Sequence, residues 1–84
     1  MPAQEVNEIT EKIIGCAYSV SNTLGIGFVE KVYENAMVVA ISKTGLLVEQ
    51  QYPIKVIFDR VIVGDFYADL FVEKRVLVEL KAAC

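Results

Sequence analysis

The chain of 84 residues is long enough for one domain only, and 55% of its residues are hydrophobic. That apolar content is too high for a disordered protein, while the longest apolar run, Ala36 to Ile41, is far too short to cross a membrane. The net charge of −3 offers no basic footprint for nucleic-acid phosphates. We therefore expect a cytoplasmic domain without membrane contact, whose excess apolar surface favours self-association.

The cysteine and histidine counts exclude several kinds of site. Cys16 and Cys84 are the two cysteines, and the chain has no histidine. A disulfide scaffold, most zinc sites and every histidine-based catalytic triad are therefore excluded. Cys16 lies on an apolar helical stripe and is predicted to be a core residue, whereas Cys84 is expected to be exposed.

Apolar residues recur at helical spacing in the first half of the chain. A first helix is predicted to start after an N-cap at Asn7 and to end at Gly25. A second helix is predicted from Val29 to Ile41, with Gly45 as its stop signal. The turn between the two helices contains Gly25 and Gly27.

After Gly45 the pattern becomes that of β-strands. Asp59–Arg60 is predicted to be a two-residue turn, Gly64–Asp65 a break or bulge, and Pro53 the border or interruption of a strand. The predicted strand segments are Leu46–Gln51, Ile54–Phe58, Val61–Val63, Phe66–Val72 and Val76–Lys81. The fold class is therefore α+β, with two N-terminal helices followed by a three- to four-stranded, mostly antiparallel sheet.

The last predicted hairpin carries the clearest chemical signal. A three-residue loop at 73–75 places Asp69 directly opposite Glu79, on the polar face of the strand pair. Opposed Cβ atoms lie roughly 4.5–5.5 Å apart, so the two carboxylates repel unless a cation lies between them. Mg²⁺ prefers such oxygen ligands. Lys81 would then stand beside the metal, where it could orient a water molecule or stabilise charge on a phosphate.

The same hairpin face also has a simpler interpretation. It could be solvated, with Lys81 paired across the strands to Asp69 or Glu79. A loop of two or four residues would moreover put the two carboxylates on opposite faces.

Glu30 and Tyr33 lie three residues apart on the predicted second helix and so share a face. In one account Gly27 is the N-cap, Glu30 reaches back to it, and Tyr33 packs in the core. In the other account Glu30 is a further acid near the metal and Tyr33 contacts the metal or the substrate. The segment 49–51 could direct one side chain to the same place, or could be a polar strand end.

Two blocks of the sequence resemble a known family. The pattern Gly27-x-x-Glu30-x-x-Tyr33 resembles the signature of the GxxExxY proteins, which belong to the PD-(D/E)XK nuclease-like superfamily. The segment 67–82 resembles the Asp…Glu-x-Lys segment of the same family. The resemblance implies an α-β-β-β-α-β core and a divalent cation, Mg²⁺ or Mn²⁺, with nucleic acid as substrate. It implies these site residues: Glu30 as the helix acid, Asp69, Glu79 and the Leu80 carbonyl as metal ligands, and Lys81 as the catalytic lysine.

The sequence ends soon after Lys81, whereas members of that family continue through a helix and a further strand. We therefore expect residues 1–84 to form a single nuclease-like domain that lacks the usual C-terminal helix and strand. An open sheet edge would then favour a homo-oligomer. Two functions follow: a metal-dependent phosphodiesterase, or a non-catalytic, self-associating interaction module on the same scaffold.

Overall fold

Two helices precede three strands along the chain. The computed structural model describes residues 3–81. Its elements are α1 (Ala3–Leu24), α2 (Glu30–Lys43), β1 (Val48–Phe58), β2 (Val61–Val72) and β3 (Val76–Val78). The strands form one antiparallel sheet in the order β1-β2-β3, which confirms the predicted α+β class.

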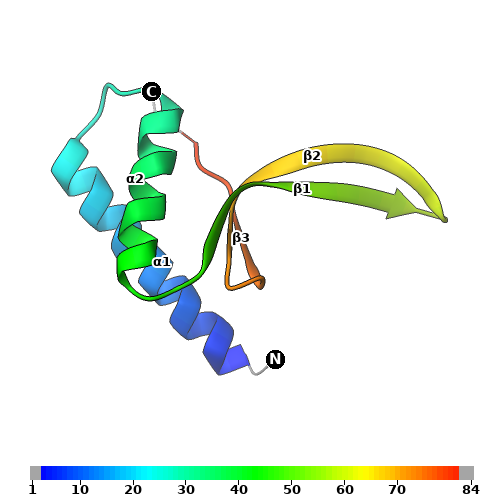
Figure 1. Ribbon diagram of the computed structural model, residues 1–84, viewed down its shortest axis with the longest axis horizontal. Coiled ribbons are helices and arrows are strands. Elements are labelled where there is room, and N and C mark those ends of the chain that lie inside the picture. Colours follow the sequence, from blue (N-terminus) through cyan, green and yellow to red (C-terminus); the bar gives the residue numbers. More distant parts are fainter. Residues whose placement is uncertain (1–2, 82–84) are drawn as a thin grey trace.

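The helices cover only one end of the sheet (Figure 1). Helix α1 contacts α2 and β3, and α2 contacts β1 and β2. Beyond this contact region β1 and β2 continue together as a long hairpin that projects away from both helices. The molecule is accordingly elongated, with principal extents of 45 × 32 × 18 Å. Within residues 3–81, no helix is long and apolar enough to span a membrane.

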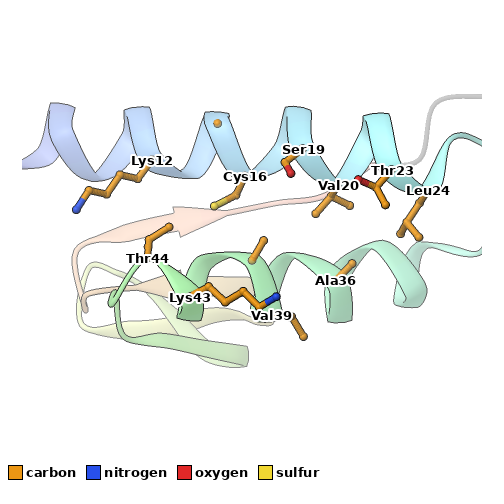
Figure 2. Close-up of a pocket in the computed structure, with 12 residues that line it drawn as sticks. Lys12, Cys16, Ser19, Val20, Thr23, Leu24, Ala36, Val39, Lys43 and Thr44 are labelled. Atoms are coloured by element: carbon orange, nitrogen blue, oxygen red, sulfur yellow. The ribbon is translucent and has the colours of Figure 1, made fainter.

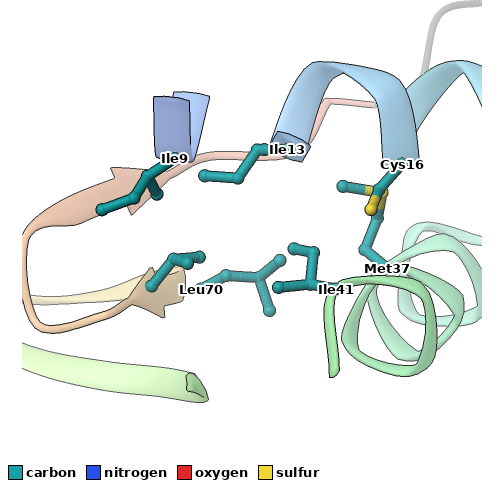
Figure 3. Packing of buried hydrophobic residues seen from close by; sticks show 7 residues of the cluster. Ile9, Ile13, Cys16, Met37, Ile41 and Leu70 are labelled. Carbon is teal, nitrogen blue, oxygen red and sulfur yellow. The ribbon is translucent and has the colours of Figure 1, made fainter. Parts of the chain in front are cut away.

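The core lies between the two helices and the C-terminal end of β2, which pairs with β3 (Figure 3). Spacings of three and four residues place its helical members on one stripe of each helix. Cys16 is among them, which confirms that it is a core residue. Cys84 lies outside the described residues. The core cluster consists of Ile9, Ile13, Cys16, Met37, Ile41, Leu70 and Val72.

The β2–β3 hairpin has the predicted register. Val72 pairs with Val76, and Leu70 pairs with Val78, on either side of a three-residue loop. The apolar face of β2 is fully buried at Ala68, Leu70 and Val72, as alternation predicts. However, β3 ends at Val78. The predicted pairing of Asp69 with Glu79 across the two strands is therefore not part of the ladder.

Several predicted element boundaries are wrong, among them the end of the last strand, which is predicted at Lys81 but lies at Val78. Helix α1 begins at Ala3, so Asn7 lies inside the helix rather than at its N-cap. Strand β1 runs through Pro53 without a break. The reason is that β1 is an edge strand. A proline is tolerated there because its missing N–H can face the open side of the sheet, where no strand needs it.

The two predicted irregularities of the long hairpin are present. Asp59 and Arg60 form a two-residue turn in which both φ angles are positive, at 52° and 65°. The β1–β2 register shifts by one residue between Val56 and Ile57, next to Gly64, so that β2 carries a bulge but remains one continuous strand.

Candidate functional site

Asp69 holds the chain that follows β3 against β2. Its Oδ2 atom accepts a hydrogen bond from the main-chain N–H of Leu80, with an N···O distance of 2.6 Å. The structure therefore brings together two residues of the predicted site, Asp69 and Leu80. Asp69 is half-buried, whereas Glu79 and Lys81, on either side of Leu80, are exposed. The three residues of the predicted Glu-x-Lys segment thus run past the Asp69 carboxylate.

The donor chemistry of this segment suits a hard cation. Carboxylates at Asp69 and Glu79 and the carbonyl oxygen of Leu80 are oxygen ligands of the kind that Mg²⁺ takes. Within residues 3–81 no group of three or more His, Cys, Asp or Glu side chains could hold a metal ion. A metal at this place would therefore depend on two carboxylates together with a main-chain oxygen and water.

A second carboxylate, Glu34 of α2, is buried against β1 with only 5% of its surface exposed. Its Oε2 accepts hydrogen bonds from Lys31 Nζ at 2.8 Å and Gln50 Nε2 at 2.7 Å, and its Oε1 accepts one from Gln51 Nε2 at 2.9 Å. Burial raises the pKa of Glu34, but these hydrogen bonds and the charge of Lys31 outweigh it and hold that pKa below its ordinary value. Glu34 is therefore ionised at neutral pH.

Gln51 allows β1 to contact Glu34 with two consecutive side chains. In a regular strand, neighbouring side chains point to opposite faces. Gln51 instead has a positive φ of 50°, and both Gln50 and Gln51 reach the Glu34 carboxylate. Gln51 lies between the pairs Gln50–Leu70 and Tyr52–Ala68, which is the level of Asp69 on β2. Segment 49–51, which could have directed one side chain to the predicted metal site or been a polar strand end, instead directs Gln50 and Gln51 to Glu34.

The signature segment shapes the loop before α2. Gly27 has a φ of +107°, a backbone conformation that residues other than glycine rarely adopt. The Tyr33 hydroxyl donates a hydrogen bond to the Gly25 carbonyl oxygen at 2.7 Å and accepts one from the Phe28 N–H at 3.3 Å. Tyr33 therefore closes the loop that contains Gly27.

Gly27 is not the N-cap of α2. That position belongs to Val29, which makes no side-chain cap hydrogen bond, and the helix begins at Glu30. Glu30 is exposed in the first turn, where its negative charge lies at the positive end of the helix dipole. Glu34 rather than Glu30 is the acid of α2 that contacts the sheet.

Two hollows differ in their relation to these residues. A cavity of about 200 Å³ beside the glycine loop is bordered by Gly27, Phe28, Tyr33, Leu80 and Lys81, so it joins the two signature blocks. A larger groove of about 740 Å³ runs between α1 and α2 (Figure 2). None of the predicted site residues lines that groove.

Sequence reasoning missed Glu34, although the sequence contains a signal for it. Met37 and Ile41, three and seven residues further on, form the buried stripe of α2. An acidic residue in such an apolar stripe must find partners on folding, because an unpaired buried charge is very costly. Its spacing from Met37 could therefore have marked Glu34 as a buried, hydrogen-bonded carboxylate.

Residues 7–84 match the family model of the PD-(D/E)XK nuclease superfamily. The chain belongs to this superfamily. No curated protein and no solved structure matches the chain. The family match spans both signature blocks of this PD-(D/E)XK domain, including Gly27, Asp69 and the segment that follows β3.

Proposed function

We propose that this PD-(D/E)XK domain is a Mg²⁺- or Mn²⁺-dependent phosphodiesterase that acts on nucleic acid and belongs to the GxxExxY branch. One observation carries the proposal: Asp69 binds the N–H of Leu80 and so keeps the Glu-x-Lys segment beside its carboxylate. Membership of a nuclease superfamily supports the same chemistry. The net charge of −3 means that a cation would have to offset repulsion between the domain and a phosphate backbone.

In this proposal the site residues have distinct roles. Asp69, Glu79 and the Leu80 carbonyl would hold the cation, which when bound supplies Lewis-acid activation of water and of the phosphate. The Lys81 ammonium donates hydrogen bonds to phosphate oxygens and stabilises the charge that develops there. Glu30 would support the site from the first turn of α2.

Glu34 is proposed as a positioning residue. Its hydrogen bonds to Gln50 and Gln51 fix β1 against α2 at the level of Asp69. Because the ionised Glu34 carboxylate is buried, losing these hydrogen bonds would be costly, so they resist displacement of β1 relative to α2. The neighbouring strand β2, which carries Asp69, is held in place through its pairing with β1.

A cleavage assay with matched variants tests the enzyme proposal. In Asp69→Asn the side-chain oxygen still accepts the Leu80 N–H, while the negative charge is removed. The control is Asp65→Asn, because Asp65 lies on the same strand but is exposed and paired with Lys55. With Mn²⁺ and single- or double-stranded DNA and RNA, we expect cleavage by the wild type and Asp65→Asn and only background cleavage by Asp69→Asn. Equal cleavage by all three proteins would contradict the proposal, as would an inactive wild type.

The alternative function is a non-catalytic, self-associating interaction module. The exposed apolar side chains of the β1–β2 hairpin favour it, since contiguous apolar patches of this kind usually mark interaction surfaces. A wild type that associates with itself, cleaves no nucleic acid and does not respond to Mn²⁺ would support the module over the enzyme.

A further inference from the structure

The outer part of the β1–β2 hairpin, residues 54–66, is termed the arm. It projects beyond the helices, which leaves its strands without a covering layer among the described residues (Figure 1). Its large apolar side chains are widely exposed, and Phe58 reaches 73%. The exposed members are Val56, Ile57, Phe58, Val61, Ile62, Val63 and Phe66.

One face of the arm continues the face that forms the core. Phe66 shares its side of β2 with Ala68 and Leu70, because side chains alternate along a strand. Ile54 pairs with Phe66, and Phe58 pairs with Val61. Five apolar residues therefore lie on the core side of the arm, and they are called the arm face: Ile54, Val56, Phe58, Val61 and Phe66.

The charged residues of the arm lie outside the arm face, and their charges sum to zero. Lys55 and Asp65 are register partners on the opposite face, where Lys55 Nζ is 3.4 Å from Asp65 Oδ1. The remaining two charges, Asp59 and Arg60, are in the turn. The arm thus has no net charge, and the arm face has no charged residue. Its partner must be apolar, which excludes a phosphate backbone as the occupant.

We infer that the arm face of one copy packs against the arm face of a second copy. The two copies would be related by a two-fold axis, so that each surface meets itself, as in most homodimers. Two twisted hairpins can stack face to face about 10 Å apart, with their inner side chains interdigitated. This inference specifies the surface of the proposed self-association and does not depend on nuclease activity.

The size of the arm face sets the expected strength of the dimer. Five partly exposed side chains would bury several hundred Å² per copy, which is less than the ~800 Å² of a standard interface. Charge repulsion is weak because the arm is neutral. We therefore expect a dimer that dissociates on dilution rather than a permanent one.

Sedimentation velocity over a dilution series tests the inference with two adjacent substitutions. Phe58→Glu places a charge on the arm face, and Ile57→Glu places the same charge on the opposite face, at a residue with 64% exposure. We expect Phe58→Glu to weaken the dimer by about tenfold or more, because its charge would be buried. Ile57→Glu is expected to dimerise like the wild type.

Folding and the identity of the partner are controlled separately. Both side chains are exposed, so dilute monomers of the three proteins should melt at the same temperature. In a mixture of labelled and unlabelled wild type, contacts between the Phe58 ring of one copy and Val56 methyl groups of the other support the inference. The inference is overturned by a wild type that stays monomeric at millimolar concentration, by equal weakening in both variants, or by monomers that insert the arm into phosphatidylcholine vesicles.

Discussion

Asp69 accepts the main-chain N–H of Leu80 at 2.6 Å, although β3 has already ended at Val78. A side-chain carboxylate thus takes the place of a main-chain acceptor and keeps the following residues beside β2. The bond uses the Oδ2 atom of the Asp69 carboxylate and links it to the residue that directly follows Glu79. This hydrogen bond allows a sharp test of metal binding, because Asp69→Asn removes the negative charge but keeps a side-chain oxygen that can accept the Leu80 N–H.

Thermal unfolding with and without Mn²⁺ makes that test. A ligand at about one hundred times its dissociation constant stabilises the folded state by roughly 2.7 kcal/mol. We expect Mn²⁺ to raise the unfolding midpoint of the wild type and to leave that of Asp69→Asn unchanged. The exposed Asp65→Asn control should respond to Mn²⁺ as the wild type does, because Asp65 pairs with Lys55 outside the predicted site.

The opposite result has a definite meaning. If Mn²⁺ changes neither midpoint, and Asp69→Asn is already more stable than the wild type, then the carboxylates of Asp69 and Glu79 merely repel each other. The proposed metal site would then be abandoned. The arm-face dimer would be unaffected, since its residues lie on another part of the hairpin.

Glu34 is expected to make stability depend on pH in the acid range. Its pKa in the folded state lies below the ordinary 4.5, so its contribution is fully present above 4.5 and is lost as the pH falls through the folded-state value. Glu34→Gln should therefore lower the free energy of unfolding by about 1.5–3 kcal/mol at neutral pH. The difference between wild type and variant should shrink as the solution becomes more acidic, which denaturant titrations at several pH values will measure.

Glu30→Gln is the matched control for this prediction. Glu30 lies one helical turn earlier on α2 but is exposed and interacts mainly with the helix dipole. Its substitution should cost no more than about 0.5 kcal/mol. A free-energy difference for Glu34→Gln that stays constant across the acid range would mean that the ionised carboxylate is not the stabilising group.

The features that the sequence predicts correctly are local. Alternation and a three-residue loop were enough to predict the Val72–Val76 register, and an apolar stripe was enough to place Cys16 in the core. The start of α2 was not predictable from cap chemistry, because its N-cap Val29 makes no side-chain hydrogen bond. The break expected at Pro53 depended on whether β1 is central or at an edge, which local sequence does not specify.

The missed part of the site depends on contacts between distant segments. Glu34 receives hydrogen bonds from Gln50 and Gln51, which are 16 and 17 residues away. The second of these bonds further requires a positive φ at Gln51 within strand β1. Glutamine is not a residue type that predicts such a conformation from sequence. The end of β3 at Val78 is likewise a result of tertiary structure, because the sequence continues with alternating residues.

Tyr33→Phe should loosen the glycine loop. The substitution removes the hydroxyl that donates to the Gly25 carbonyl and accepts from the Phe28 N–H. We expect a loss of about 1 kcal/mol in the free energy of unfolding and faster hydrogen exchange at the Phe28 amide. Tyr18→Phe is the control, since Tyr18 is 68% exposed on α1. Unchanged exchange at Phe28 in Tyr33→Phe would show that the loop is held by other contacts.

Two glycine substitutions should change stability in opposite directions. A Cβ atom added at either Gly15 or Gly27 would meet no atom within 4 Å, so steric contact does not distinguish them. They differ in backbone conformation: Gly27 has a φ of +107°, whereas Gly15 lies within helix α1. Gly27→Ala should cost about 1–3 kcal/mol because an alanine is strained there. Gly15→Ala should add about 0.5–1 kcal/mol because alanine favours the helix.

Denaturant unfolding of the two variants beside the wild type gives both free energies in one series. Destabilisation by Gly27→Ala together with stabilisation by Gly15→Ala would assign the glycine of the GxxExxY-like signature to backbone conformation. If Gly27→Ala is instead neutral, the loop can adopt an ordinary φ at residue 27. The hydrogen bonds of Tyr33 would then have to hold more than one loop conformation, and the cavity beside Lys81 would not have a fixed wall.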